Sequence, residues 1–263
     1  MPRVAVNGVG FRVEDVGAGP PLLLIMGLGA SLETWVLQRD AFAARHRVIL
    51  FDNRGAGESD SPPGPWTVPA MAADAVGLMD ALGVARAHVL GVSMGGMIAQ
   101  EMAIRHPSRI ARMVLAVSFA RPDPVRRAFL LHRRWARALG ADPVQESVAA
   151  LPWLVSPRVL NDPQRLGQIM ALVAGMPMMA ADAYGSQIDA ILEHDTLSRL
   201  HQVQAPTLVL AAAEDVLTPV ALSREIAAAI PGARLQVLPH GNHAVQIEQP
   251  EAFNAAVLDF LAE

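Results

Sequence analysis

The chain has 263 residues, of which 52% are hydrophobic and 17% charged, so it is long enough and apolar enough to fold around a large core. Its net charge of -4 comes from 25 acidic and 21 basic residues, and no arginine-rich stretch predicts a nucleic-acid surface. The sequence contains neither lysine nor cysteine, which excludes Schiff bases, a P-loop lysine, disulfides and thiolate chemistry.

The ends and the apolar segments of the chain bear on location and partners. The segment from Met1 to Gly10 lacks the apolar run of a secretory signal, and no segment reaches the ~18 uninterrupted apolar residues of a membrane-spanning helix. We therefore expect a cytoplasmic protein that acts on a small molecule, with no nucleic-acid partner, membrane partner, cofactor or metal. The oligomeric state stays open.

Short β-rich segments alternate with helical ones through the first half of the chain. The expected strands are Phe11–Val16, Pro21–Met26, Arg47–Phe51, His88–Val92 and Arg109–Val117. Apolar residues three or four apart between Val68 and Leu82, followed by Gly83, predict an amphipathic helix between the third and fourth strands. This alternation is typical of an α/β fold with a mostly parallel sheet and flanking helices.

The strand pattern stops from about residue 120 to residue 200. Arginine, methionine, leucine and proline dominate there, in helix-length pieces such as Pro124–Leu139 and Asp162–Met176. Strands resume at Ala205–Ala211 and Arg234–Leu238, and Pro250–Leu261 has the early proline and acid of a helix start. We predict a core built from residues 1–119 and 201–263, with a helical cap inserted at residues 120–200.

Ser93 is the candidate nucleophile. It follows the strand His88–Val92 and precedes the expected helix Met97–Arg105, with Gly91 and Gly95 on either side. A serine on such a sharp strand-to-helix turn needs glycine neighbours, because the strained backbone brings adjacent main chain too close for side chains. The alternative is a glycine-rich turn that only packs a helix on a strand.

His243 is the candidate base. A serine hydroxyl needs a group that takes its proton as it attacks, and imidazole has a suitable pKa. Among eight histidines, His243 lies just beyond the last expected strand, in a loop that can reach the carboxyl edge of the sheet. His240 lies nearer that strand and is the alternative.

Asp215 is the candidate acid that orients the histidine. In this kind of fold the acid follows the serine and precedes the histidine. Two adjacent carboxylates, Glu214 and Asp215, follow the strand Ala205–Ala211. Asp215 precedes a turn that ends in Pro219 and is the better choice, which leaves Glu214 as a solvated neighbour.

Four segments together resemble the α/β-hydrolase superfamily, and most closely its small bacterial esterases, 3-oxoadipate enol-lactonases and cofactor-free haloperoxidases. They are Gly91 to Gly96, Asp52 to Ser59, Glu214 to Pro219, and Gly241 to Glu251. The resemblance implies the α/β-hydrolase fold, and an oxyanion hole formed by the backbone N–H groups of Leu28 and Met94. Many relatives have histidine-glycine where this chain has Met26-Gly27, so a side chain that often braces this loop is missing.

The glycines that begin at Gly27 also imitate a dinucleotide-binding fingerprint. Gly27 and Gly29 follow an expected strand, and Asp52 comes 25 residues after Gly27. Leu32 replaces the third glycine, and a dehydrogenase would leave the serine, histidine and acid unexplained. Asp52 and Arg54 are more simply a pair that braces a loop.

The expected cap carries most of the large apolar candidates for a substrate pocket. The candidates there are Trp135, Trp153, Tyr184 and a group of methionines, Met170, Met176, Met178 and Met179. Trp35 follows the oxyanion loop and is a further candidate. Most of these side chains can equally be cap core, because methionine fills irregular gaps, but together they predict an apolar pocket.

The resemblance implies a serine hydrolase that cleaves a carboxylic ester or lactone with an apolar acyl or alcohol part, through an acyl-enzyme. Two alternatives stay open: a carbon–carbon hydrolase or perhydrolase with the same residues, and a ligand receptor with slow turnover. Serine rather than aspartate at position 93 argues against dehalogenase and epoxide hydrolase chemistry. Ala244 stands where carbon–carbon hydrolases of this family often have tryptophan.

Overall fold

One sheet organises the computed structural model, which describes residues 3–175 and 177–263. Its strands lie in the order β1-β2-β4-β3-β5-β6-β7-β8. They are β1 (Arg3–Val6), β2 (Val9–Val16), β3 (Pro21–Ile25), β4 (Arg47–Phe51), β5 (Ala87–Val92), β6 (Ile110–Ala116), β7 (Thr207–Ala212) and β8 (Arg234–Leu238). Strands β3 to β8 are parallel, whereas β2 runs antiparallel to both of its neighbours.

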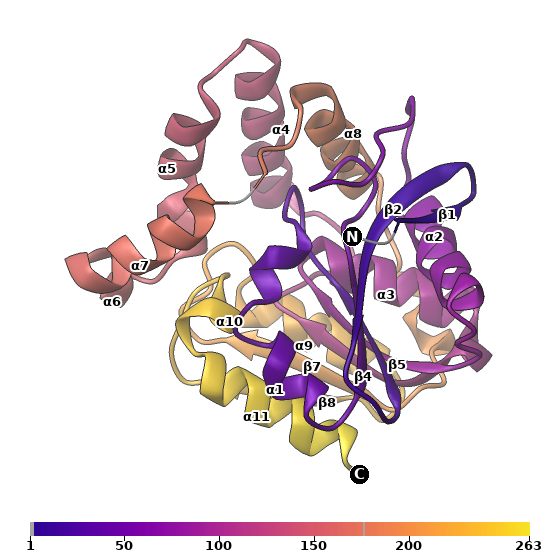
Figure 1. Ribbon diagram of the computed structural model, residues 1–263. Helices are drawn as coiled ribbons and strands as arrows, with labels where there is room; N and C mark the ends of the chain where they lie inside the picture. The colour runs from indigo at the N-terminus through magenta and orange to yellow at the C-terminus, as the bar shows by residue number, and fades with distance from the viewer. Residues whose placement is uncertain (1–2, 176) are drawn as a thin grey trace.

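Helices cover both faces of this sheet (Figure 1). Apart from the helices between β6 and β7 that are described below, the α-helices are α1 (Arg39–Ala43), α2 (Val68–Ala81), α3 (Met94–Arg105), α9 (Val220–Ala229), α10 (Val245–Glu248) and α11 (Pro250–Leu261). The 3-10 turns are η1 (Leu32–Trp35), η2 (Pro107–Arg109) and η3 (Leu197–Gln202). Buried side chains of α2, α3 and α9 form one core cluster with the sheet, and those of α1 and α11 form the other. The central strands need both layers because every residue of β7 is buried.

Helix boundaries follow the capping residues in the sequence. Thr67 accepts a hydrogen bond from the backbone N–H of Ala70 at 3.2 Å and so caps the start of α2. The helix ends at Ala81, and Gly83 takes a φ of 70°, as the glycine stop predicts. The α/β-hydrolase fold expected from the sequence is confirmed.

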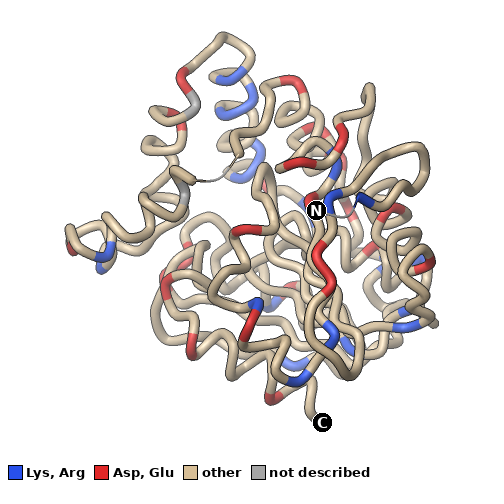
Figure 2. Tube along the Cα trace, in the orientation of Figure 1, with Lys and Arg blue, Asp and Glu red and all other residues tan. Residues whose placement is uncertain are grey.

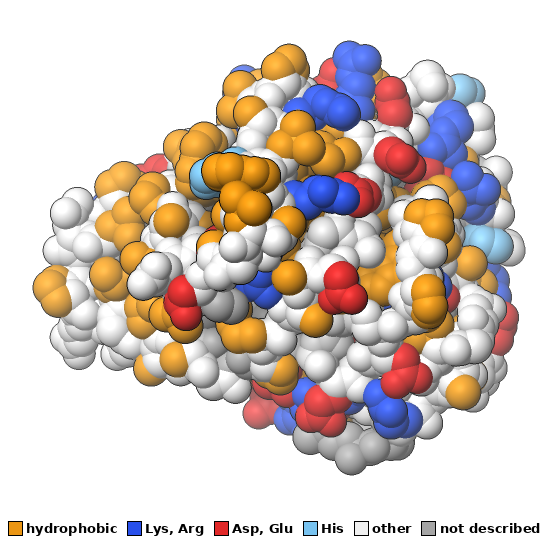
Figure 3. Space-filling view, turned by 90° about the horizontal axis from the view of Figure 1, so that it is seen from above, with side chains coloured by type: hydrophobic (Ala, Val, Ile, Leu, Met, Phe, Trp, Pro, Cys, Tyr) orange, Lys and Arg blue, Asp and Glu red, His pale blue; other side chains and the backbone are white. Residues whose placement is uncertain are grey.

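Among the described residues, five α-helices precede η3 in the segment between β6 and β7, where the strand pattern stops. They are α4 (Pro124–Ala138), α5 (Pro143–Leu154), α6 (Pro157–Leu160), α7 (Pro163–Ala174) and α8 (Ala181–Leu192). Figure 1 shows them as a layer above the sheet, with α5 to α7 extending to one side. Basic residues gather along α4 (Figure 2), and hydrophobic side chains lie among charged ones on the face seen from above (Figure 3). We call these five helices the cap.

The structure adds one strand that the sequence pattern did not predict. Strand β1 pairs with the start of β2 through a turn at Asn7 and Gly8, whose φ values are 51° and 77°. Positive φ at both positions suits a tight hairpin, and Asn-Gly is its strongest sequence signal. The strand was missed because it is only four residues long, too short for its alternation of exposed and inward residues to stand out in the sequence.

No helix among residues 3–175 and 177–263 is long and apolar enough to cross a membrane.

His194 predicts how the stability of the fold depends on pH. Its side chain is buried just after α8, and burial lowers its pKa to about 4. Between about pH 6.5 and 4 the unfolded chain therefore binds a proton that the folded chain does not, so stability is lost as the pH falls through that window. We expect His194 to account for a loss on the order of 2 kcal/mol between pH 7.5 and 5, since one pKa unit is about 1.4 kcal/mol.

Urea unfolding of wild type and His194→Gln at several pH values measures this loss. The variant should lose less stability than wild type between pH 7.5 and 5, whatever its stability at neutral pH. His201→Gln replaces an exposed histidine and serves as the control. Parallel curves for wild type and His194→Gln would contradict the assignment.

Candidate active site

Ser93 forms the turn between β5 and α3. Its backbone has φ 56° and ψ -118°, a region that costs a non-glycine residue about 1–3 kcal/mol. Two contacts hold this conformation: the Ser93 N–H donates to the carbonyl of Ala116 at 3.0 Å, and Ser118 Oγ donates to the Ser93 carbonyl at 2.8 Å. Strand β6 and the segment that follows it therefore fix the serine on both sides.

The glycines around Ser93 are required by close approach of the main chain. A Cβ at Gly91 would lie 2.2 Å from the carbonyl oxygen of Gly95, and one at Gly95 would lie 2.0 Å from that of Ile25 in β3. Neither neighbour can yield, because both are backbone atoms of buried elements. A Cβ at Gly96 would meet Ser118 at 2.7 Å, so Gly96 allows α3 to pack against the segment after β6.

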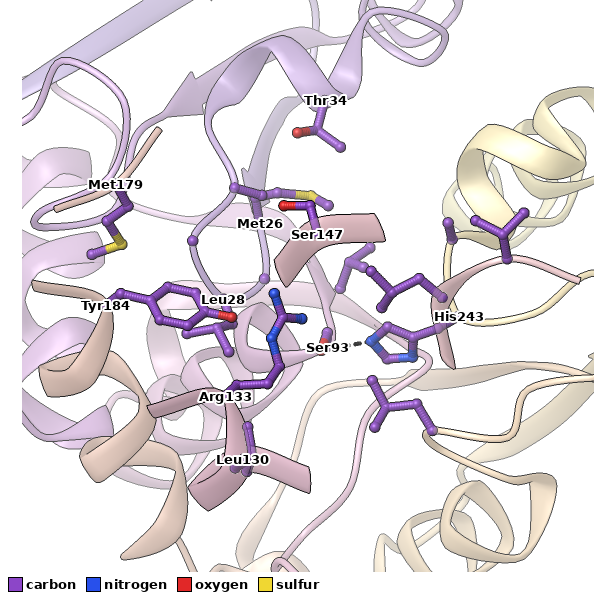
Figure 4. Close-up of a pocket in the computed structure, with 18 of the residues that line it drawn as sticks. Met26, Leu28, Thr34, Ser93, Leu130, Arg133, Ser147, Met179, Tyr184 and His243 are labelled. Carbon is purple, nitrogen blue, oxygen red and sulfur yellow. Dashed lines mark hydrogen bonds between the residues drawn. The ribbon is translucent and has the colours of Figure 1, made fainter. Parts of the chain in front are cut away.

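His243 lies beside Ser93, as Figure 4 shows. Its Nε2 is 2.9 Å from Ser93 Oγ, and its Nδ1 is 3.1 Å from Asp215 Oδ2. The loop after β8 brings it there, and the Asn242 side chain accepts the His243 backbone N–H at 2.9 Å. The alternative base, His240, contacts a different residue. It is partly exposed, and its Nδ1 lies 3.8 Å from Glu214 Oε1.

Asp215 is buried and hydrogen-bonded from several directions. Its Oδ1 accepts the backbone N–H groups of Leu217 and Thr218 at 2.8 and 2.7 Å, and its Oδ2 accepts the Thr218 hydroxyl at 2.5 Å. Burial alone raises the pKa of this carboxyl, but the nearby His243 and these hydrogen bonds outweigh burial and hold the pKa below its ordinary value. The carboxylate therefore accepts His243 Nδ1–H, which leaves the Nε2 lone pair for Ser93.

Glu214, the neighbouring carboxylate, faces away from this chain of contacts. It accepts the backbone N–H of Gly241 at 3.2 Å and lies 3.1 Å from the Arg158 guanidinium. Its role in the structure is to brace the loop that carries His243.

The loop after β3 places Leu28 at the cavity wall. Gly27 passes so close to the serine that a Cβ there would lie 3.1 Å from Ser93 Cβ. Asn53 Nδ2 donates to the Met26 carbonyl at 3.0 Å and helps to hold the loop. Met94 is the first residue of α3, where a backbone N–H has no partner within the helix. Both predicted oxyanion donors thus lie on segments adjacent to Ser93.

A cavity of about 280 Å³ opens above Ser93 and His243. Its wall is mostly apolar, with contributions from Leu28, Phe119, Phe129, Leu130, Met179 and Tyr184. Of the aromatic residues proposed from the sequence for this pocket, Tyr184 lines it. Met170, Met178 and Met179 also line it, whereas Met176 lies outside the described residues.

The three tryptophans do not line this cavity among the described residues, which corrects the sequence-based expectation. Trp35 is fully buried in the core cluster on the α1 and α11 face of the sheet. Trp135 points outward from α4 and is 61% exposed, and Trp153 packs on Phe129 with ring centroids 5.0 Å apart. For Trp135 the reason is helix phase, because the inward positions on α4 are those of Arg126, Leu130 and Arg137.

A charged pair closes the roof of the cavity. Arg133 of α4 and Glu146 of α5 form an ion pair at 2.5 Å, and the Arg133 guanidinium lies 5.4 Å from the centre of the Tyr184 ring. Arg137 stacks on the same ring at 5.2 Å and donates to the Met179 carbonyl. Burial is the main reason that the pKa of Tyr184 rises to about 12, so the phenol stays neutral.

Two further residues, Thr218 and Glu248, hold the site together and were not predicted from the sequence. Thr218 contacts both Asp215 and, at 3.2 Å, His243 Nδ1. Glu248 accepts the N–H of Asn242 at 3.1 Å and that of Ser156 at 3.0 Å, so it joins the histidine loop to the cap. Both residues stand in the segments that carry the family resemblance, and that is the signal that could have found them. The described residues contain no cluster of three or more metal-ligating side chains.

Residues 20–250 match the family model described as the alpha/beta hydrolase fold. The chain belongs to this family of hydrolases.

Its relatives carry several different activity names. The chain is 37% identical over 259 residues to a Caulobacter sp. K31 protein named as a carbamate hydrolase, RutD, and the aligned region covers 95% of each chain. It is 34% identical to a Mycobacterium tuberculosis protein named as a non-heme bromoperoxidase, BpoC, over 97% of this chain and 98% of the other. The crystal structure of the enol-lactonase from Burkholderia xenovorans LB400 superposes with a TM-score of 0.90, at 32% identity over the whole of both chains.

Replacing each carboxylate by its amide tests whether Asp215 or Glu214 orients His243. Asp215→Asn removes the negative charge and favours the wrong histidine tautomer, so kcat on a simple ester should fall by about 10³–10⁴-fold. Glu214→Gln is the matched control and should change kcat little. A crippled Glu214→Gln beside a nearly normal Asp215→Asn would show that Glu214 is the acid.

Proposed function

We propose that the chain is a serine hydrolase that cleaves carboxylic esters or lactones with an apolar acyl or alcohol part. The observation that carries this proposal is the 2.9 Å contact between Ser93 Oγ and His243 Nε2 at the floor of an apolar cavity. A hydroxyl and an imidazole that served only as a structural hydrogen bond would need no such cavity, whereas an acyl-transfer site needs a place for the carbonyl beside both groups.

In the proposed reaction Ser93 Oγ attacks the substrate carbonyl carbon while His243 Nε2 takes the hydroxyl proton. Ionised Asp215 stabilises the resulting imidazolium through Nδ1–H. The backbone N–H groups of Leu28 and Met94 donate to the oxygen on which negative charge develops. The tetrahedral intermediate then collapses, and His243 gives the proton to the departing alkoxide. Water repeats the sequence on the acyl-enzyme, which releases the acid and restores Ser93.

The cavity favours a small substrate with much apolar surface. Leu130, Phe119 and Met179 remove water from the bound acyl or alcohol part, and burial of apolar surface contributes about 25 cal/mol per Å². Relatives named as enol-lactonases support a lactone among the substrates. The relative named as a bromoperoxidase favours a second candidate, in which peroxide replaces water as the nucleophile on the acyl-enzyme.

An activity screen of the purified protein tests the proposed function. The panel contains p-nitrophenyl esters of increasing acyl length, lactones and vinylogous diketones, the last being substrates of carbon–carbon hydrolases. We expect steady turnover of short to medium esters or lactones, with preference for apolar acyl groups. Binding of a panel compound with no more than one turnover would instead favour the receptor alternative.

Alanine variants of Ser93, His243 and His240 test the proposed nucleophile and base in the same screen. Ser93→Ala and His243→Ala should lose esterase activity while keeping the wild-type melting temperature within the spread of repeat measurements. His240→Ala changes a partly exposed histidine three residues away and should stay active. An active His243→Ala with an inactive His240→Ala would overturn the proposed base.

A further inference from the structure

Gln187 of α8 connects the cap to the loop that carries the proposed oxyanion donor. Its side-chain Oε1 accepts the backbone N–H of Gly29 at 2.9 Å, and its Nε2 donates to the carbonyl of Arg54 at 3.0 Å. The residue is fully buried. The two partners fix which end of the carboxamide is which, because an N–H needs an acceptor and a carbonyl needs a donor.

The loop that Gln187 holds is a tight turn. The Ala30 N–H donates to the Gly27 carbonyl at 3.3 Å, and Gly29 has a φ of 69°. Positive φ at the third of four residues is the mark of a type II turn, which differs from type I in the orientation of its central peptide. That central peptide is Leu28–Gly29, whose N–H is the one that Gln187 accepts.

A second residue of α8 seats the helix on the same turn. Tyr184 precedes Gln187 by one helical turn, and a Cβ at Gly29 would lie 2.9 Å from Tyr184 Cε2. Figure 4 shows the Tyr184 side chain next to Leu28 at the cavity wall. The helix thus covers Gly29 with an aromatic ring and bonds its N–H with an amide.

We propose that Gln187 is a positioning residue of the oxyanion hole. Its amide fixes the central peptide of the turn from Gly27 to Ala30 and so anchors Leu28. The N–H of Leu28 lies on the preceding peptide and is the proposed donor to the carbonyl beside Ser93. Gln187 stands in for the bracing side chain that Met26-Gly27 lacks, and it makes the hole depend on the cap. This inference rests on the proposed hydrolase function and adds a specific role for α8.

Loss of the amide should weaken the transition state more than the ground state. In Gln187→Leu the Gly29 N–H loses its acceptor, so the peptide that follows Leu28 is no longer anchored and Leu28 is held less firmly beside Ser93. We expect kcat on a p-nitrophenyl ester to fall by about 10- to 100-fold, less than the full loss of an oxyanion donor, with little change in KM. The inhibition constant of an alkyl boronic acid, which forms a tetrahedral anion on Ser93, should rise by the same factor.

Gln100→Leu is the matched control. Gln100 is another fully buried glutamine, on α3, and its Nε2 donates to the Phe119 carbonyl at 3.2 Å. We expect this variant to melt at a lower temperature than wild type, yet to keep kcat and boronate affinity. Gln187→Met, which keeps the unbranched length, is measured beside Gln187→Leu so that a folding defect in one variant leaves the comparison intact.

The outcomes separate this inference from the proposed function. A Gln187→Leu protein with lowered melting temperature but unchanged kcat and boronate affinity would show that Gln187 only fills space and would overturn the inference. A raised KM with unchanged kcat would overturn it as well, because the effect would lie in substrate binding. Wild-type protein that neither turns over esters nor binds the boronate would refute the proposed function, and the inference with it.

Discussion

The left-handed backbone of Ser93 is the constraint on which the rest of the site depends. Such a conformation is unfavourable for serine, so it persists only where the surrounding structure determines it more strongly than local preference does. Here β5 and α3 are both buried, and hydrogen bonds to Ala116 and Ser118 fix the peptide groups on either side. The close approach of Gly95 to the Ile25 carbonyl in β3 then ties the serine to the strand that leads into the Gly27 loop.

Parallel strands bring the other parts of the site to the same edge. Strands β3, β5, β7 and β8 all run in one direction, so the loops that follow them meet at their carboxyl ends. Ser93 follows β5, Asp215 follows β7, and His243 follows β8. Side chains from three distant parts of the sequence therefore come within hydrogen-bond distance at this edge, whereas much of the cavity wall above them comes from the cap.

This division explains what the sequence could predict. Strand-to-helix turns, glycine positions and the order of the polar residues are local features, so the fold and the neighbourhood of Ser93 followed from pattern and family resemblance. An apolar pocket followed too, and Tyr184 and three of the methionines line it, but its complete lining did not, because that depends on the phase of helices whose packing is set by distant contacts. On α4 the guanidinium groups of Arg133 and Arg137 turn inward onto Tyr184 and Trp135 turns outward, the reverse of what residue type alone suggests. Gln187 was missed for a similar reason, since its partners Gly29 and Arg54 lie more than 130 residues away.

The central claim is that Ser93 Oγ is the nucleophile of acyl transfer. An organophosphonate with a good leaving group reacts with such an oxygen and leaves a stable adduct, which peptide mass spectrometry locates. We expect one phosphonyl group per chain, on the peptide that contains Ser93, with loss of esterase activity in proportion to labelling and no labelling of Ser93→Ala. Labelling that persists in Ser93→Ala, or an adduct on another residue that abolishes activity, would contradict it.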